Sequence, residues 1–233
     1  MGPRRASVDV LVEILAPAGK RVIDVGCGDG FLVRHLARHG AHALGVECNL
    51  HQLAKARAIA PVGDETYVGG VGQALPLADG LADAVVFFNS LHHVPPPEMG
   101  QALSEAARAL GPKGLVYVSE PLAEGPFFAL LRPVHDETQV RAAAWRALRA
   151  AGACGLTMTH EILHVNPVAH PDFEAFRERV ETITPETRPR FQALEAEMRA
   201  AFARLGRRQD GHFVFDQPMR VNVLVRASSP GVG

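Results

Sequence analysis

A strand that runs into a glycine-rich turn near the amino terminus constrains the fold more than any other stretch of this chain. Residues 22–30 read VIDVGCGDG, an apolar run that closes on an acid and then carries three glycines spaced by two. The amphipathic residues 31–39 follow at once and predict a helix. Glycine reaches positive φ at little cost, and the start of a helix offers unpaired N–H donors. The stretch therefore predicts a strand, a tight turn and a helix that hold a polar, nucleoside-sized ligand.

The spacing of these glycines argues against two common nucleotide loops. The dinucleotide pattern Gly-x-Gly-x-x-Gly, counted from Gly26, needs a third glycine at Phe31, whereas the third glycine is Gly30. No Gly-x-x-x-x-Gly-Lys-Ser/Thr string occurs in the chain, so the usual nucleoside triphosphate loop is excluded. A nicotinamide cofactor is the weaker fit.

Residues 22–30 resemble motif I of the class I S-adenosylmethionine-dependent methyltransferases, which is an apolar strand, an acid and Gly-x-Gly-x-Gly. Later segments resemble that family in the same order as far as Pro121: the acid Glu47, the segment 70–77 (GVGQALPL), the turn 111–114 (GPKG) and the pair Glu120-Pro121. The resemblance implies a small-molecule, type-11-like methyltransferase domain. Its cofactor would be S-adenosyl-L-methionine and its product S-adenosyl-L-homocysteine.

The apolar segments predict an α/β fold with a doubly wound sheet. Strands are expected at residues 22–25, 43–46, 66–69, 82–88, 115–119, 156–165 and 219–226. The fourth is apolar throughout, as expected when helices cover both faces. The resemblance implies a Rossmann-like seven-stranded sheet of order 3-2-1-4-5-7-6 with strand 7 antiparallel.

Two helical patterns separate the last two strands, at residues 173–183 and 191–205. We expect one methyltransferase domain over residues 1–233, with a helical insertion at residues 168–210 between strands 6 and 7. An insertion of this size needs a purpose, and we interpret it as a lid over the acceptor site or, alternatively, a dimerisation arm. Residues 228–231 (SSPG) predict a disordered tail.

The resemblance places the cofactor-binding residues in the loops that follow four strands. Glu47 would accept both ribose hydroxyls, because a carboxylate offers two oxygens in one plane. Val71 stands where the family has an aspartate for the adenine amino group, so adenine would depend on Gly72 and Gln73. The methionine end would be held by the acid and the glycines of the turn. The complete predicted set is Asp24, Gly26, Cys27, Gly28, Gly30, Glu47, Cys48, Gly72, Gln73 and Asn89.

A catalytic base is needed only if the acceptor is a hydroxyl or a protonated amine, because transfer from a sulfonium is an in-line displacement. Histidine titrates near neutral pH and is the obvious candidate. We predict His93, after the fourth strand, or His135, beside an aspartate and a glutamate, as the catalytic residue. An alternative role for His93 is a structural hydrogen bond within its loop. The histidines ranked behind these two are His92, His164, His170 and His212.

No metal is predicted. Ubiquinone-biosynthesis O-methyltransferases hold a divalent ion with Glu-x-x-Glu-His after the fourth strand, and the matching residues here are Asn89, His92 and His93. Both carboxylates are gone, and hard cations prefer oxygen ligands. A His-Glu-x-x-His string at residues 160–164 falls in a predicted strand, where the two imidazoles would lie too far apart to share a zinc ion.

Composition narrows the function further. The chain has 24 basic and 25 acidic residues, a net charge of −1, so no global field recruits nucleic acid or an anionic membrane. No apolar run is long enough to span a bilayer or to form a signal peptide, and the three cysteines lack a Cys-x-x-Cys pair. We therefore expect a cytoplasmic monomer or homodimer with a small-molecule acceptor and no nucleic-acid or membrane partner.

The leading hypothesis is S-adenosylmethionine-dependent O- or N-methylation of a small molecule by in-line transfer. The alternative, favoured by Val71, is a non-enzymatic protein that binds S-adenosylmethionine or S-adenosylhomocysteine as a partner subunit or sensor. Methylation of nucleic acid or protein ranks lower. The chain has no Asn/Asp-Pro-Pro-Tyr/Phe string after the fourth strand, and its charge is balanced.

Overall fold

The structure is a computed structural model that describes residues 2–227. The predicted tail at residues 228–231 lies outside this range. The chain forms two compact units, which are described separately. The sheet unit comprises Ser7–Glu120, Ala142–Ile162 and the described residues from Arg220 onward. The aromatic unit comprises Pro121–Arg141, Leu163–Met219 and the described residues before Ser7.

The strands are β1 (Arg21–Val25), β2 (His42–Glu47), β3 (Asp64–Gly69), β4 (Ala82–Phe88), β5 (Leu110–Pro121), β6 (Leu156–His170), β7 (Arg207–Gln209) and β8 (His212–Arg226). The α-helices are α1 (Ser7–Leu15), α2 (Phe31–Arg38), α3 (Leu50–Ala58), α4 (Met99–Ala109), α5 (Gly125–Leu131), α6 (Thr138–Arg149), α7 (Phe173–Ile183), α8 (Arg188–Ala193) and α9 (Glu195–Leu205). Short 3₁₀ helices are η1 (Leu91–His93), η2 (Pro96–Glu98), η3 (Ala151–Cys154) and η4 (Pro185–Thr187). None of the helices between residues 2 and 227 combines the length and the apolar character needed to cross a bilayer.

The strands pair in the order β3-β2-β1-β4-β5-β8-β6, and the short β7 pairs with β8. β1 is parallel to β2 and to β4, β2 is parallel to β3, and β4 is parallel to β5. The predicted seventh strand is β8, so the observed order is the predicted 3-2-1-4-5-7-6 with β7 as an extra strand. The predicted doubly wound α/β fold is confirmed.

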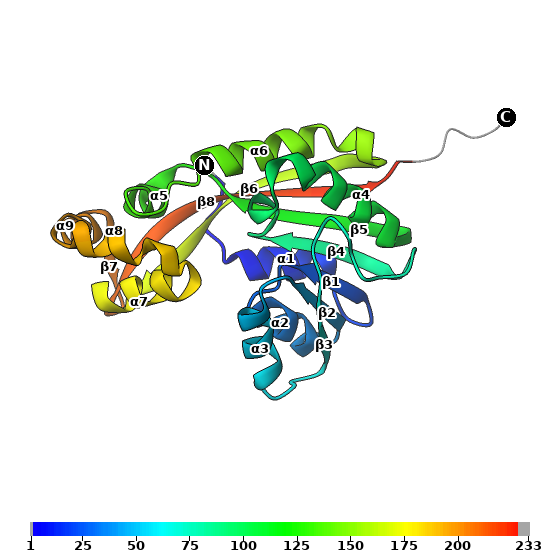
Figure 1. Cartoon of the computed structure of the whole chain (residues 1–233), viewed down its shortest axis with the longest axis horizontal. Helices are drawn as coiled ribbons and strands as arrows, with labels where there is room; N and C mark the ends of the chain where they lie inside the picture. The colour runs from blue at the N-terminus through cyan, green and yellow to red at the C-terminus, as the bar shows by residue number, and fades with distance from the viewer. Residues whose placement is uncertain (1, 228–233) are drawn as a thin grey trace. The chain divides into compact units, whose positions relative to one another are not determined.

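Helices cover both faces of the sheet (Figure 1). Apolar side chains of the central strands pack against these helices. This two-sided burial explains why residues 82–88 are a continuous apolar run instead of an alternating one. The face covered by α4 and α6 includes Ile23, Val85, Phe87, Val116, Met99, Leu103 and Leu148. The face covered by α1 and α2 includes Val22, Val86, Tyr117, Leu11, Leu15, Val33 and Leu36.

Several elements differ from the sequence prediction at their ends. β5 starts at Leu110, because the predicted turn at residues 111–114 is an irregularity within the strand: Ala82 pairs with Leu110 and Ala84 with Leu115. β6 and β8 are both longer than predicted, and α5 was not predicted. The His-Glu-x-x-His string lies on β6, so its assignment to a strand is confirmed.

The aromatic unit is built around a cluster of phenylalanines. The helices α7, α8 and α9 occupy the predicted insertion between β6 and β8, and Asp172 caps α7 by accepting the N–H of Ala175 at 2.8 Å. The buried members of the cluster are Leu130, Val134, Phe173, Phe176, Phe191, Met198, Phe202 and Phe215. The insertion is therefore helical, and it shares a core with Leu130, Val134 and Phe215, which lie outside it. Its two predicted roles, lid and dimerisation arm, stay predictions.

His170 at the end of β6 is buried in this aromatic cluster. Its ring centroid lies 6.1 Å from that of Phe127, in a stacked arrangement, and 5.3 Å from that of Phe176, edge to face. Its Nε2 atom is buried without a hydrogen-bond partner. Burial, and then the charge of Arg179, lowers the pKa of His170.

The lowered pKa makes the stability of the aromatic unit sensitive to acid. The unfolded chain binds a proton at His170 as pH falls below about 6.5, whereas the folded protein does so only at lower pH, so stability is lost in that window. We expect His170→Phe to lose less stability than wild type between about pH 7.5 and pH 5, as measured by urea denaturation. The matched control is His212→Phe, because His212 is exposed at the start of β8. Equal losses in both variants would contradict the assignment.

Candidate functional site

The three glycines after β1 all have left-handed backbone conformations, with φ of 76° at Gly26, 56° at Gly28 and 80° at Gly30. A Cβ added to Gly26 would lie 2.8 Å from the Cβ of Ser90, and one added to Gly30 would lie 2.6 Å from Cε1 of Tyr67. A Cβ added to Gly28 would meet nothing within 4 Å. Gly26 and Gly30 are thus required by close packing as well as by φ, whereas the main chain at Gly28 faces open space.

Hydrogen bonds fix the glycine turn to the end of β2. The N–H groups of Gly26 and Cys27 both donate to the carbonyl oxygen of Val46, at 2.8 and 3.2 Å. The N–H of Gly28 donates to Oε2 of Glu47 at 2.7 Å, and the N–H of Asn49 donates to Oε1 at 2.7 Å. Glu47 is buried, with 7% of its surface exposed. A single carboxylate therefore ties together the corners that follow β1 and β2.

This geometry fits the predicted nucleoside. Each oxygen of Glu47 accepts one N–H and can accept a second hydrogen bond, which matches a ribose diol. The open space at Gly28 would let a ligand approach the main chain, and an alanine methyl group would project into it. The first N–H of α2 is not fully available, because Phe31 donates to Oδ1 of Asp29 at 3.1 Å.

Burial changes the acidity of the groups beside the turn. Asp24 is 2% exposed, and burial followed by the charge of Glu47 raises the pKa of Asp24 from 3.8 to about 8. Burial also raises the pKa of the Cys27 thiol and, to a smaller extent, that of the Cys48 thiol. Both cysteines therefore remain neutral thiols and are poor nucleophiles.

The loop after β3 lies against the end of β1. A Cβ added to Gly72 would lie 3.3 Å from Cγ1 of Val25. The side-chain amide of Gln73 donates one of its two N–H groups to Oε2 of Glu98 at 2.5 Å, which leaves its carbonyl oxygen and its second N–H for other hydrogen bonds. Val71 is 38% exposed. The groups of this loop that could make the predicted adenine contacts are the main chain and the remaining hydrogen-bonding groups of the Gln73 amide.

The turn after β4 is joined to β1. The N–H of Asn89, whose φ is 56°, donates to the carbonyl oxygen of Ser119 at 2.8 Å. The buried hydroxyl of Ser90 donates to the carbonyl oxygen of Val25 at 2.6 Å. β1 and β4 are the neighbouring strands at which the sheet order reverses, and ligands of doubly wound folds bind at such a switch point.

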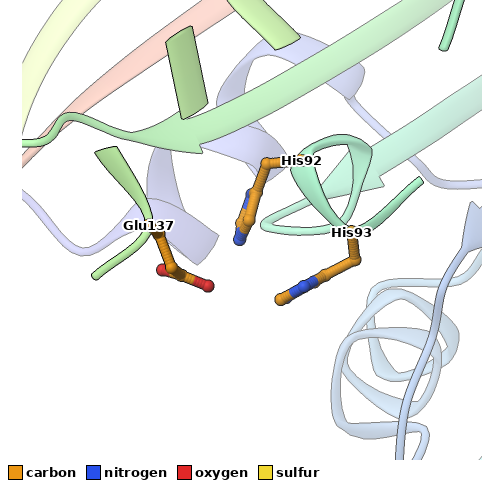
Figure 2. A group of neighbouring side chains, drawn as sticks. All are labelled: His92, His93 and Glu137. Atoms are coloured by element: carbon orange, nitrogen blue, oxygen red, sulfur yellow. The ribbon is translucent and has the colours of Figure 1, made fainter. Parts of the chain in front are cut away.

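His92 and His93 follow on η1, and Figure 2 shows their two side chains. Their ring centroids are 4.1 Å apart. His92 is buried and its Nδ1 contacts Oε2 of Glu120, whereas His93 is exposed. The buried member of the pair is thus the histidine that sequence reasoning ranked behind its neighbour.

His135, the second predicted base, lies in the aromatic unit. Its Nε2 lies 2.9 Å from Oε1 of Glu137, whose Oε2 accepts a hydrogen bond from Arg141 at 2.6 Å. The bond to Glu137 is the main cause that raises the pKa of His135. A histidine that holds its proton more firmly is less often in the basic form at neutral pH.

The structure brings most of the predicted site residues to one edge of the sheet unit. Those at the carboxyl ends of β1 to β4 or in the loops that follow are Asp24, Gly26, Cys27, Gly28, Gly30, Glu47, Cys48, Gly72, Gln73, Asn89 and His93. Their roles stay predictions. Sequence reasoning missed the contact of Glu120 with His92; the available signal was the acid that closes the fifth strand.

The raised pKa of Asp24 has a measurable consequence for stability. Between pH 3.8 and about 8 the folded protein keeps a proton that the unfolded chain loses, so stability falls as pH rises through this window. Asp24→Asn mimics the protonated carboxyl group. We expect this substitution to remove this part of the pH dependence. At pH 8 the free energy of unfolding of the variant, measured by urea denaturation, should exceed that of wild type by roughly a few kcal/mol. If the free energies of unfolding of the two proteins changed in parallel from pH 5 to pH 8, the raised pKa of Asp24 would be contradicted.

A family model described as a methyltransferase domain matches residues 23–118. An uncharacterized methyltransferase of Mycobacterium sp. (strain JLS) is 37% identical over 112 residues, which are 48% of this chain and 42% of that protein. The chain therefore spans less than half the length of this curated relative.

Solved structures share the fold at low sequence identity. The YcgJ protein from Bacillus subtilis has a TM-score of 0.64 at 19% identity, covering 96% of this chain and 99% of that chain. The cyclase SpnF has a TM-score of 0.61 at 20% identity, covering 95% of this chain and 82% of that chain. At such identities the likeness shows the fold alone.

The matched segment runs from β1 into β5 and contains the glycine turn, Glu47 and the turn after β4. Of the segments on which the sequence resemblance was based, the glycine turn, Glu47 and residues 70–77 and 111–114 lie within the match, and the pair Glu120-Pro121 lies just beyond it. The resemblance to the class I S-adenosylmethionine-dependent methyltransferases is therefore confirmed over residues 23–118, which match a methyltransferase domain.

Proposed function

We propose that this protein transfers the methyl group of S-adenosylmethionine to the oxygen or nitrogen of a small-molecule acceptor. One observation carries the proposal. The buried carboxylate of Glu47 holds the N–H of Gly28 at the edge of open space, between the ends of β1 and β2. A nucleoside needs this pairing of a diol acceptor with close main-chain approach.

Different residues around the turn bind different parts of S-adenosylmethionine. Bound S-adenosylmethionine supplies an electrophilic methyl group on a positively charged sulfonium. Glu47 accepts the ribose hydroxyls, and the main chain at Gly72 with the amide oxygen of Gln73 holds the adenine. Asp24 is neutral below about pH 8, and a nearby positive charge on the donor would favour its ionised form. Asp24 thereby contributes selectivity for a cationic ligand.

Charge and sequence support a small acceptor. The net charge of −1 gives no general attraction to nucleic acid or to an anionic membrane. The residues after β4 read NSLHHV and lack the Asn/Asp-Pro-Pro-Tyr/Phe string of base-amino methyltransferases. We therefore propose an acceptor that is neither nucleic acid nor lipid surface, and a monomer or homodimer as the acting form.

A non-enzymatic binder is the second candidate, and Val71 favours it. This side chain is apolar and 38% exposed at the place where the family carries an aspartate for adenine. Such a protein would bind S-adenosylhomocysteine and serve as a partner subunit or sensor. The two candidate functions differ in that only the methyltransferase would convert S-adenosylmethionine to S-adenosylhomocysteine.

A labelled donor tests the proposal. The protein is incubated with methyl-labelled S-adenosylmethionine and an extract of the cells that express it, and the products are separated into dialysable molecules, protein and nucleic acid. We expect the label in dialysable products that separate from S-adenosylmethionine by chromatography and that do not form with heat-inactivated protein. Label in protein or nucleic acid would contradict the acceptor class, and tight S-adenosylhomocysteine binding with no transfer to any fraction would favour the binder.

Gly28→Ala tests the cofactor site, and Gly19→Ala is its matched control. Both glycines have positive φ, 56° and 72°, and an added Cβ would meet nothing within 4 Å at either position. Each substitution should therefore cost a similar backbone strain of about 1 kcal/mol. We expect only Gly28→Ala to weaken S-adenosylhomocysteine binding in calorimetry, by about tenfold or more. Equal affinities in the two variants would place the ligand elsewhere.

A further inference from the structure

The loop between β3 and β4 is attached to the helix α4 by two side chains of that helix. Glu105 accepts the N–H of Leu75 at 2.9 Å. Arg108 donates to the carbonyl oxygen of Leu77 at 2.7 Å, and it also donates to Glu105. These bonds hold the loop that carries Gln73 against the helix.

The side-chain amide of Gln73 is oriented by a separate bond, to the carboxylate of Glu98 on η2. Nε2 of Gln73 donates to Oε2 of Glu98 at 2.5 Å, and both residues are half-buried. A carboxylate accepts hydrogen bonds and does not donate them, so the NH₂ group of the amide must face Glu98. If the amide rotated by 180°, two acceptor oxygens would meet. Glu98 therefore selects one of the two orientations of the Gln73 amide.

An amide held in one orientation distinguishes two kinds of purine. Adenine carries a donor, its 6-amino group, between ring nitrogens that accept, and an amide pairs with this pattern through its oxygen and one N–H. Hypoxanthine instead carries an acceptor oxygen at position 6 and a donor N–H at position 1. An amide that rotates freely can match either base, whereas an amide that is held matches one. The groups of Gln73 not used by Glu98 are its oxygen and its second N–H.

We propose that Gln73, with Glu98 as its positioning residue, makes the donor site selective for a 6-amino purine nucleoside over a 6-oxo purine nucleoside. This inference rests on the function proposed above. Val71 has no acceptor atom in its side chain, and the amide oxygen of Gln73 supplies the acceptor for the 6-amino group instead. The bond to Glu98 keeps that oxygen from exchanging places with the NH₂ group.

Calorimetry with two nucleosides tests this selectivity in the wild-type protein. S-adenosylhomocysteine carries a 6-amino purine, and S-inosylhomocysteine carries a 6-oxo purine on the same ribose and amino acid. We expect the first to bind about tenfold more tightly or better, because the second brings an oxygen against the oxygen of Gln73. Equal affinities, or a preference for the inosyl compound, would overturn the inference.

Glu98→Gln tests the positioning role without removing the contact. Glutamine has the shape of glutamate, but its amide both donates and accepts, so it can pair with Gln73 in either orientation. We expect the preference for the adenosyl compound to fall to about threefold or less, chiefly because the inosyl compound binds more tightly than it does to wild type. A wild-type preference in this variant would overturn the role given to Glu98.

Two further variants separate orientation from attachment of the loop. Gln73→Met removes the amide and should also reduce the preference to about threefold or less. Glu105→Gln is the matched control, because Glu105 holds the same loop through Leu75 while Glu98 holds Gln73. We expect it to keep the wild-type preference even if both affinities fall. An equal loss of preference in Glu105→Gln and Glu98→Gln would overturn the inference, because the bond to Glu98 would then only attach the loop.

The outcomes distinguish this inference from the proposed function. If the wild-type protein bound neither nucleoside, the proposed function would fail. If it bound both with the same affinity, only the inference would fail. The ratio of two affinities measured on one protein is unaffected by a general loss of folded protein, because both nucleosides meet the same folded fraction.

Discussion

The hydrogen bond between the N–H of Gly28 and the carboxylate of Glu47 is the interaction on which the site depends. It joins the turn after β1 to the corner after β2, and the second oxygen of Glu47 holds the N–H of Asn49 at the start of α3. Hydrogen bonds to a charged acceptor are stronger than neutral ones, so a buried carboxylate suits this position. The same charge helps to keep the neighbouring Asp24 protonated.

A second hydrogen bond, between Ser90 and Val25, connects the turn after β4 to the glycine turn. Ser90 ties the turn after β4 to the end of β1, so the glycine turn is held from both sides, by β2 and by β4. The parallel order of these strands places their carboxyl ends along one edge. The proposed donor site and the His92–Glu120 pair thus lie at the edge that this strand order creates.

The sequence predicted those parts of the fold that are encoded locally. The glycine turn, Glu47 and the apolar run of β4 each stand within a few residues of the structural feature they specify. The helix α5 was missed because its apolar residues are buried only by packing against the phenylalanine cluster of the aromatic unit, which is formed by residues distant in the sequence. The extra length of β6 and β8 was missed because strand ends depend on pairing partners distant in the chain.

In the candidate site, too, features encoded locally could be predicted and contacts between distant residues could not. The loops of the proposed cofactor site could be located from the sequence, because their residues follow strands whose order was predicted correctly. The contact between His92 and Glu120 joins residues 28 positions apart, and that between Gln73 and Glu98 joins residues 25 apart. Each of these contacts depends on how neighbouring strands and helices are aligned, and no local sequence pattern determines that alignment. The sequence alone could not show that His92 is buried beside Glu120 whereas His93 is exposed.

The most direct test of the account is the affinity of Glu47→Gln for S-adenosylhomocysteine. Glutamine keeps the shape of Glu47 but has one acceptor oxygen where the carboxylate has two. Glu65→Gln is the matched control, because Glu65 is also buried and accepts two main-chain N–H groups, from Val62 at 2.7 Å and Gly63 at 2.8 Å. In calorimetry we expect Glu47→Gln to weaken binding by roughly 10- to 100-fold and Glu65→Gln to leave it unchanged. Equal affinities in the two variants would contradict the claim that Glu47 holds the donor.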